Sequence, residues 1–308
     1  MKRALAVALA CAATAAAAAS VDTVGYTAAP QPYARIEIKH SAMNVRLALG
    51  IPKLLLLNLP AGERAHLKAV PLLGKGTAKI NLFPGGEVTY RANLYDVAAG
   101  GRSPTSVPVA WLDKSVADDA DGILSVFALN ADHVAIVQPA APVGGTSFVV
   151  ARDGRGDPVS TVRIGDGKLR VIFDLRLPQT IMNSAAAQLV ERAGLAKRAG
   201  KVGLWQPFPG HALPFETMTP APGATLLGLP LTAPTARITE ARARELDAAA
   251  RAGNSTSADD VDAIVVTAQS RRRGDAWVIV GRDVTARCSR IELDRPGARW
   301  LFTCNFAG

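Results

Sequence analysis

The sequence has few of the residues on which most enzyme sites depend. Its 308 residues include four His and three Cys, and aromatic residues make up 5%. The His residues are scattered without the spacing of metal ligands, so the sequence predicts no metal site and no cofactor. The short motifs of serine hydrolases, zinc peptidases, thiol oxidoreductases and phosphate-binding loops are absent too. These absences exclude the common hydrolase and nucleotide-binding families.

Concentrated positive charge and long apolar runs are also scarce. The formal net charge of +9 is spread thinly, and the only dense basic cluster is Arg271-Arg272-Arg273. That cluster is too short for a nucleic-acid footprint, so no nucleic-acid partner is expected. Beyond the N-terminus no segment has the roughly 20 apolar residues of a membrane helix, so no stable membrane span is expected. The sequence leaves the oligomeric state open.

Residues 1–19 have the three parts of a secretory signal peptide. Lys2 and Arg3 form a charged start, residues 4–13 are apolar, and the run from Ala15 to Ala19 offers several cleavage sites. We therefore expect cleavage near Ala19 and a periplasmic or secreted location. Lipidation of Cys11 instead of its removal is the alternative, although it would leave a very short apolar region.

Cysteine usage agrees with export. Once Cys11 is removed with the leader, the mature chain contains Cys288 and Cys304, which are 304 − 288 = 16 residues apart. An even pair of cysteines in an exported protein predicts a disulfide.

Alternation of apolar and polar residues predicts a mainly β fold. Ala34–Lys39 and Asn44–Leu49 alternate in this way. Two more alternating runs, 77–83 and 88–95, flank Pro84-Gly85-Gly86 and predict a hairpin. Helices are predicted over 183–193 and 239–252.

Two stretches share one layout, in which an apolar run ends in a polar residue and a short loop follows. These are residues 53–69 and 170–190, and superposing Asn58 on Asp174 gives an offset of 174 − 58 = 116. Each half then ends with two apolar residues and a small one. Such an imperfect repeat indicates a duplicated architecture. The closing runs are Ile123-Leu124-Ser125 and Leu226-Leu227-Gly228.

This pattern resembles the pepsin and retropepsin aspartic proteases, in particular bacterial two-lobed retropepsin-like proteins. The matching residues are Asp121-Gly122-Ile123-Leu124, Leu226-Leu227-Gly228, and Asp174 with Thr180-Ile181. The resemblance as a whole covers roughly residues 35 to 235. The resemblance implies two aspartic-protease-like β-barrel lobes over 33–140 and 145–235. A helix and linker over 239–260 and a small disulfide-stapled β module over 262–308 would follow.

The catalytic motifs of the family are altered in this sequence. Asn58-Leu59-Pro60 and Asp174-Leu175-Arg176 stand where each lobe of the family has Asp-Thr/Ser-Gly. The family mechanism needs two carboxylates that share a proton, and an asparagine cannot ionise. We therefore interpret the chain as a pseudoenzyme, with Asn58 and Asp174 facing each other at the junction of the lobes and a peptide-binding cleft retained.

The resemblance also assigns binding roles and leaves other functions open. Thr180 follows the second motif, and Tyr90 would lie on a flap over the cleft or else pack on an ordinary surface hairpin. One alternative function is an active aspartic-type peptidase that uses Asp174 with a non-standard partner. Another is a structural or envelope-interaction protein that acts through its C-terminal module.

Overall fold

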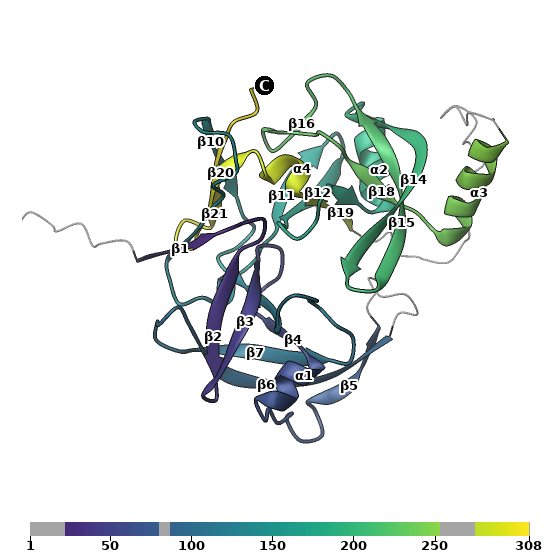
Figure 1. The fold of residues 1–308 in the computed structure, drawn as a ribbon. Coiled ribbons are helices and arrows are strands. Elements are labelled where there is room, and N and C mark those ends of the chain that lie inside the picture. The colour runs from purple at the N-terminus through teal and green to yellow at the C-terminus, as the bar shows by residue number, and fades with distance from the viewer. Residues whose placement is uncertain (1–21, 80–86, 253–274, 308) are drawn as a thin grey trace, which may run out of the picture.

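The computed structural model describes residues 22–79, 87–252 and 275–307. The predicted signal peptide with Cys11, the hairpin turn at 84–86, most of the linker, and the strand predicted over 263–268 lie outside these residues. The described chain is mainly β, as the alternation predicted (Figure 1). Among the described residues, none of the helices combines the length and apolar character that a membrane crossing requires.

The first sheet has seven strands in the order β2-β3-β8-β4-β7-β6-β5. Because β2 also pairs with β6, six of these strands close into a barrel. A short helix, α1 (Leu59–Arg64), follows β4, and a 3₁₀ turn (Val126–Ala128) follows β8. The strands are β2 (Tyr33–Ile38), β3 (Ser41–Ala48), β4 (Leu55–Asn58), β5 (Lys75–Lys79), β6 (Glu87–Ala99), β7 (Thr105–Leu112) and β8 (Gly122–Ser125).

The second sheet also has seven strands, in the order β11-β12-β19-β13-β18-β15-β14. Helix α2 (Ser184–Arg192) follows β13, and α3 (Glu240–Arg251) follows β18. Both helices were predicted from the sequence. The strands are β11 (Ser160–Ile164), β12 (Gly167–Phe173), β13 (Ile181–Met182), β14 (Ala196–Phe208), β15 (His211–Pro220), β18 (Thr235–Arg237) and β19 (Ala276–Val280).

A third sheet of five strands has the order β1-β9-β20-β21-β10. It combines strands from both ends of the chain, and a separate pair, β16 (Thr225–Leu226) and β17 (Leu229–Pro230), lies outside the three sheets. The remaining elements are β1 (Thr23–Thr27), β9 (His133–Val137), β10 (Thr146–Ala151), α4 (Arg282–Thr285), β20 (Cys288–Asp294) and β21 (Arg299–Cys304).

The first two sheets have the same topology. Their strands correspond one to one in sheet order and in chain order, and each of the six successive pairings has the same sense in both sheets. In each, a strand that precedes a helix, β4 or β13, lies between an antiparallel and a parallel neighbour. The two sheets are therefore duplicates in topology, although the sequence offset of 116 does not superpose their equivalent strands.

The pairing register differs from the offset that the sequence suggested. Leu57 pairs with Gly122 in the first sheet and Met182 pairs with Val278 in the second, which makes Asn58 the counterpart of Asn183. In the parallel neighbours, Val45 pairs with Gly122 and Val171 with Val278. Three residues after Val45 and Val171 in the chain, Ala48 therefore corresponds to Asp174.

The C-terminal segment does not form a module of its own. Strand β19 lies between β12 and β13 in the second sheet, and β20 and β21 complete the third sheet. The closing run of the second half was also misplaced. Leu226 belongs to β16, whereas β19 and Gly281 hold the position that β8 and Ser125 hold in the first sheet. The expectation of a separate β module over 262–308 is therefore wrong.

The main hydrophobic core is continuous through the three sheets. It contains Ile36 and Leu55 from the first sheet and Val171 from the second, together with the third-sheet residues Trp300 and Phe302. All five are at most 1% exposed. Alternating burial along the strands puts their apolar residues on this core, as the period of two predicts.

The predicted disulfide between Cys288 and Cys304 is present. The two residues are directly paired where β20 meets β21. Both are buried, so the bond closes the end of a hairpin inside the third sheet.

The third sheet also contains a partly buried cluster of charges. His133 Nδ1 donates a 2.7 Å hydrogen bond to Glu292, and His133 Nε2 lies 3.6 Å from Asp294. Arg290 Nε donates to Glu292 over 2.9 Å, and Arg299 Nε donates to Asp294 over 2.6 Å. Both carboxylates are therefore bound by cations.

We predict that this cluster makes the fold sensitive to acid. Burial raises the pKa of Glu292, but the hydrogen bond from His133 and a neighbouring guanidinium outweigh it and hold the pKa below its ordinary value of 4.5. Burial also raises the pKa of Asp294, and bonds from Gly297 and Arg299 hold it below 3.8. A lowered carboxyl pKa stabilises the fold above the unfolded pKa, and this stability is lost as pH falls through the folded value. The urea concentration at the unfolding midpoint should therefore decrease once the pH drops below about 4.5.

A matched pair of variants separates this cluster from other carboxyl groups. Glu292→Gln should be less stable than wild type near neutral pH and should flatten the acid limb of the stability profile. Glu37→Gln removes an exposed carboxylate that lies 3.6 Å from the exposed His40, and its profile should follow wild type. An unchanged acid limb in Glu292→Gln would contradict the prediction.

Candidate functional site

The loops that follow β3 and β12 meet each other. A Cβ added at Gly50 would lie 2.7 Å from Ile172 Cγ2, 3.0 Å from Phe173 O and 3.8 Å from Asp174 Cβ. Gly50 is therefore required for the close approach of the two loops. This contact joins equivalent ends of the two sheets, where a site shared between them would lie.

Asp174 is buried in this contact and is fully paired. Its side chain is 4% exposed, and its backbone N–H donates to Val280 O over 3.0 Å. Arg176 binds both carboxylate oxygens: Nε lies 3.0 Å from each oxygen, a terminal nitrogen lies 2.5 Å from Oδ2, and the backbone N–H lies 2.9 Å from Oδ1. Both carboxylate oxygens of Asp174 are therefore bound by the guanidinium, in the bidentate geometry typical of strong Arg–carboxylate pairs.

Asn58 does not pair with Asp174. Its Nδ2 donates to Ala117 O and Ala120 O over 2.7 and 3.0 Å, and its Oδ1 accepts from Val116 N over 2.8 Å. The amide is therefore used within the first sheet, to hold the loop that precedes β8. The structure does not bring the two predicted dyad residues together among the described contacts.

Asn183 has the equivalent role in the second sheet. Its Nδ2 donates to Asp275 O over 2.9 Å, and its Oδ1 accepts from Trp277 N and from Ala186 N. The last of these bonds caps helix α2. Sequence reasoning recognised Asn183 only as the start of a helix, although an asparagine follows a short apolar run in both halves.

Thr180 is buried and forms its hydrogen bonds within the second sheet and the loops beside it. Its hydroxyl donates to Asp283 Oδ1 over 2.9 Å and accepts from Gly281 N, and its carbonyl accepts from Thr235. Burial raises the pKa of Asp283, and the bonds from Thr180 and Thr232 oppose that rise. Thr180 therefore positions the loop after β12 and holds a buried acid that the sequence did not single out.

Tyr90 and the hairpin of β14 and β15 meet at a small apolar cluster. The cluster is formed by Ala48, Leu112, Val116, Ala117 and Ile123, with Tyr90 packed against it. Phe208, at the tip of the hairpin, packs on the same cluster, so the second sheet reaches onto the first (Figure 1). Tyr90 is thus partly buried against this contact.

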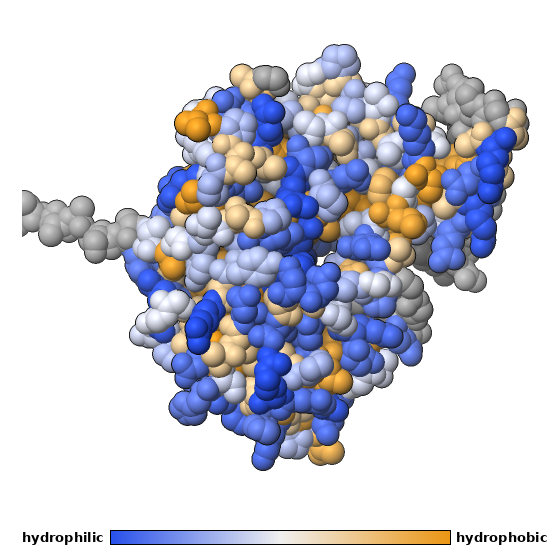
Figure 2. All heavy atoms as spheres, in the orientation of Figure 1, coloured by the Kyte–Doolittle hydropathy of each residue, from blue (hydrophilic) through white to orange (hydrophobic). Residues whose placement is uncertain are grey.

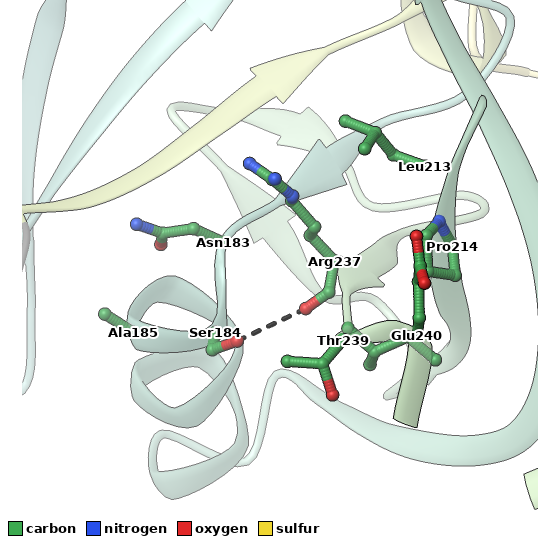
Figure 3. A pocket seen from close by; sticks show the side chains of 9 residues that line it. Asn183, Ser184, Ala185, Leu213, Pro214, Arg237, Thr239 and Glu240 are labelled. Carbon is green, nitrogen blue, oxygen red and sulfur yellow. Dashed lines mark hydrogen bonds between the residues drawn. The ribbon is translucent and has the colours of Figure 1, made fainter. Parts of the chain in front are cut away.

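A pocket of about 530 Å³ opens beside the N-terminus of α2 (Figure 3). Ser184 Oγ donates to Arg237 O across it over 3.2 Å, and burial lowers the pKa of Arg237. Hydrophobic side chains gather nearby, between α3 and the hairpin (Figure 2). The lining residues are Asn183, Ser184, Ala185, Leu213, Pro214, Arg237, Ile238, Thr239 and Glu240.

A second pocket, of about 290 Å³, lies between the loop after β12 and the hairpin. We call it the Trp205 pocket. It is lined by Pro178, Gln179, Ile181, Leu204, Trp205, Gln206, Phe215 and Thr235. In the part of the chain that the structure describes, no three His, Cys, Asp or Glu residues gather as metal ligands would.

Comparison with known proteins identifies no family for this chain. The sequence matches no protein-family model and no curated protein. The chemistry of the site therefore has to be argued from its own residues.

Proposed function

We propose that this chain is an exported protein with the two-lobed architecture of the aspartic proteases, and that it binds an extended peptide between its lobes without cleaving it. Two facts about one position carry the proposal. In the second sheet Asp174 is paired with Arg176, and in the first sheet the equivalent position is occupied by Ala48. The duplicated sheets support the architecture, and a buried disulfide supports export.

The absence of a carboxylate pair argues against cleavage. An aspartic mechanism needs one carboxyl group as base and another as acid, with a single proton between them. Ala48 offers no second carboxyl group, and both oxygens of Asp174 are bound by Arg176. Loss of a general acid–base partner costs about 10²–10⁴ in rate.

Peptide binding is supported by sheet edges and by a pocket beside them. Among the described strands, β5 is an edge strand of the first sheet, and β11 and β14 are the edge strands of the second. An edge strand can pair with an extended peptide, while pockets for alternate side chains select its sequence. The Trp205 pocket is partly formed by residues 204–206 of β14.

We predict that wild-type protein retains peptides from a mixed library but does not hydrolyse them at acid pH. Ala48→Asp should not create activity, because Arg176 would still bind both carboxylate oxygens of Asp174. The assay measures peptide retention on immobilised protein and new N-termini in solution, with Asp174→Asn as the control. Wild-type cleavage that a pepstatin-like inhibitor blocks and Asp174→Asn abolishes would overturn the proposal, as would the absence of any retained peptide.

A further inference from the structure

Strand β10 is an edge strand of the third sheet and pairs with β21 on one side only (Figure 1). Arg152 N, one residue past β10, donates to Ala298 O over 2.8 Å in the same register, so every second residue of β10 bonds toward β21. Ser147, Val149 and Ala151 are the residues in between. Among the described residues, their backbone N–H groups have no partner. The edge therefore presents a row of N–H and C=O groups to another strand.

β10 lacks the features with which natural edge strands avoid pairing, namely charged residues, a proline or a bulge. Its sequence is Thr-Ser-Phe-Val-Val-Ala, it runs along β21 without a register shift, and the side chain of Val149 is 63% exposed. At the opposite edge of this sheet, β1 has a glycine at its centre, which weakens a strand. The edges of the other two sheets carry such features: Lys75 and Lys79 on β5, Arg163 on β11, and Lys197, Arg198, Lys201, Pro207 and a register shift on β14.

The strand is complementary to a second copy of itself. Antiparallel pairing about a two-fold axis at Val149 sets Val149 opposite its own copy and Ser147 opposite Ala151. These are the residues whose N–H and C=O groups point outward, so the three pairs form roughly six backbone hydrogen bonds. On the other face of the sheet, Phe148 then lies opposite Val150. An aromatic residue facing a β-branched one stabilises a strand pair.

The same register opposes no like charges. Residues 146–151 are uncharged, and the next positions set Arg152 opposite Thr146 and Asp153 opposite Gly145. Arg152 is also buried, and carbonyl groups of its own chain bind its guanidinium. A second copy therefore supplies both a matching edge and a matching register, which identifies it as the occupant of this edge.

We propose that β10 is the dimerisation strand of this protein, and that two copies pair antiparallel about Val149 and join their third sheets into one continuous sheet. This contact uses the third sheet and is independent of the peptide binding proposed above. Pairing along six residues makes a small interface, so the dimer is weak, with a dissociation constant on the order of 10 µM.

Sedimentation equilibrium of the mature protein from about 1 to 500 µM measures the association, and wild type should pass from monomer to dimer. Val149→Lys places like charges opposite each other and should raise the dissociation constant at least about tenfold. Leu94→Lys on β6 is the matched control, because Leu94 is also 63% exposed, and it should associate as wild type does. Wild type that stays monomeric throughout would overturn the proposal and leave the edge to a partner of another sequence. Equal losses in the two variants would overturn the assignment to β10.

Cysteine variants test the register even if Val149→Lys does not fold. Facing residues of an antiparallel pair lie within disulfide reach, so Val149→Cys should form a covalent dimer with copper phenanthroline as the oxidant. Ser147→Cys would face Ala151 of the second copy and should stay unlinked, as should the equally exposed Leu94→Cys. Non-reducing gel electrophoresis gives the readout. Equal cross-linking of Val149→Cys and Leu94→Cys would overturn the proposal, and cross-linking of Ser147→Cys in place of Val149→Cys would overturn the register.

Discussion

Replacing Arg176 with alanine is expected to lower the free energy of unfolding by about 3–5 kcal/mol. The substitution leaves Asp174, whose side chain is 4% exposed, without the guanidinium that binds both of its oxygens. An ionised carboxylate without a partner in the interior is costly, since it has lost its water and gained nothing in return. Urea denaturation at neutral pH measures the effect.

Two companion variants show whether the effect comes from burial. Arg170→Ala breaks an ion pair between β12 and the exposed Asp275, and should cost at most about 1 kcal/mol. Changing Asp174 and Arg176 together to leucine should recover much of the loss, because no unpaired charge remains. A loss for Arg176→Ala as small as that for Arg170→Ala would show that Asp174 reaches water.

Replacing Cys288 and Cys304 together with alanine is expected to lower the free energy of unfolding by about 3 kcal/mol. The bond closes a loop of 16 residues in sequence separation, and its loss gives the unfolded chain more conformations. The bond joins the paired ends of β20 and β21, so the change is felt in the third sheet. Denaturant titration of wild type and variant under non-reducing conditions measures it.

Reduction provides an independent control for the disulfide. Adding reductant should shift the wild-type midpoint toward that of the double variant and leave the variant unchanged. Two titratable thiols in unfolded wild-type mature protein without reductant would show that the bond does not form. A double variant within about 1 kcal/mol of wild type would contradict the chain-entropy estimate.

Local patterns in the sequence were sufficient for strands such as β2 and β3, for helices α2 and α3, and for the disulfide. Alternation over 34–39 and 44–49 gave β2 and β3, because one face of each strand packs on the core and the other does not. The capping residues Asn183 and Thr239 fixed where α2 and α3 begin. Arg176 lies close to Asp174 because the two are only two residues apart in the chain.

Correspondence between the two sheets was decided only by the tertiary structure. Asn58 and Asp174 each follow an apolar run, yet the run before Asn58 is β4 and the run before Asp174 is β12, which hold different places in their sheets. The segments that join the equivalent positions also differ in length by one residue. Ala48 and Asn58 are 58 − 48 = 10 residues apart, whereas Asp174 and Asn183 are 183 − 174 = 9 residues apart. A single offset therefore could not align both Ala48 with Asp174 and Asn58 with Asn183.

By itself the sequence determined that alternating segments such as 34–39 and 44–49 become strands, that helices form near 183–193 and 239–252, and that Cys288 pairs with Cys304. These features depend on neighbouring residues and on the number of cysteines. Only the tertiary structure decided that β19 inserts between β12 and β13, and that Trp205 lines a pocket beside the loop after β12. An apolar run such as Val278–Val280 fits many sheet positions equally well. Its partners are chosen by backbone hydrogen bonds with strands about a hundred residues earlier, and no local pattern records that choice.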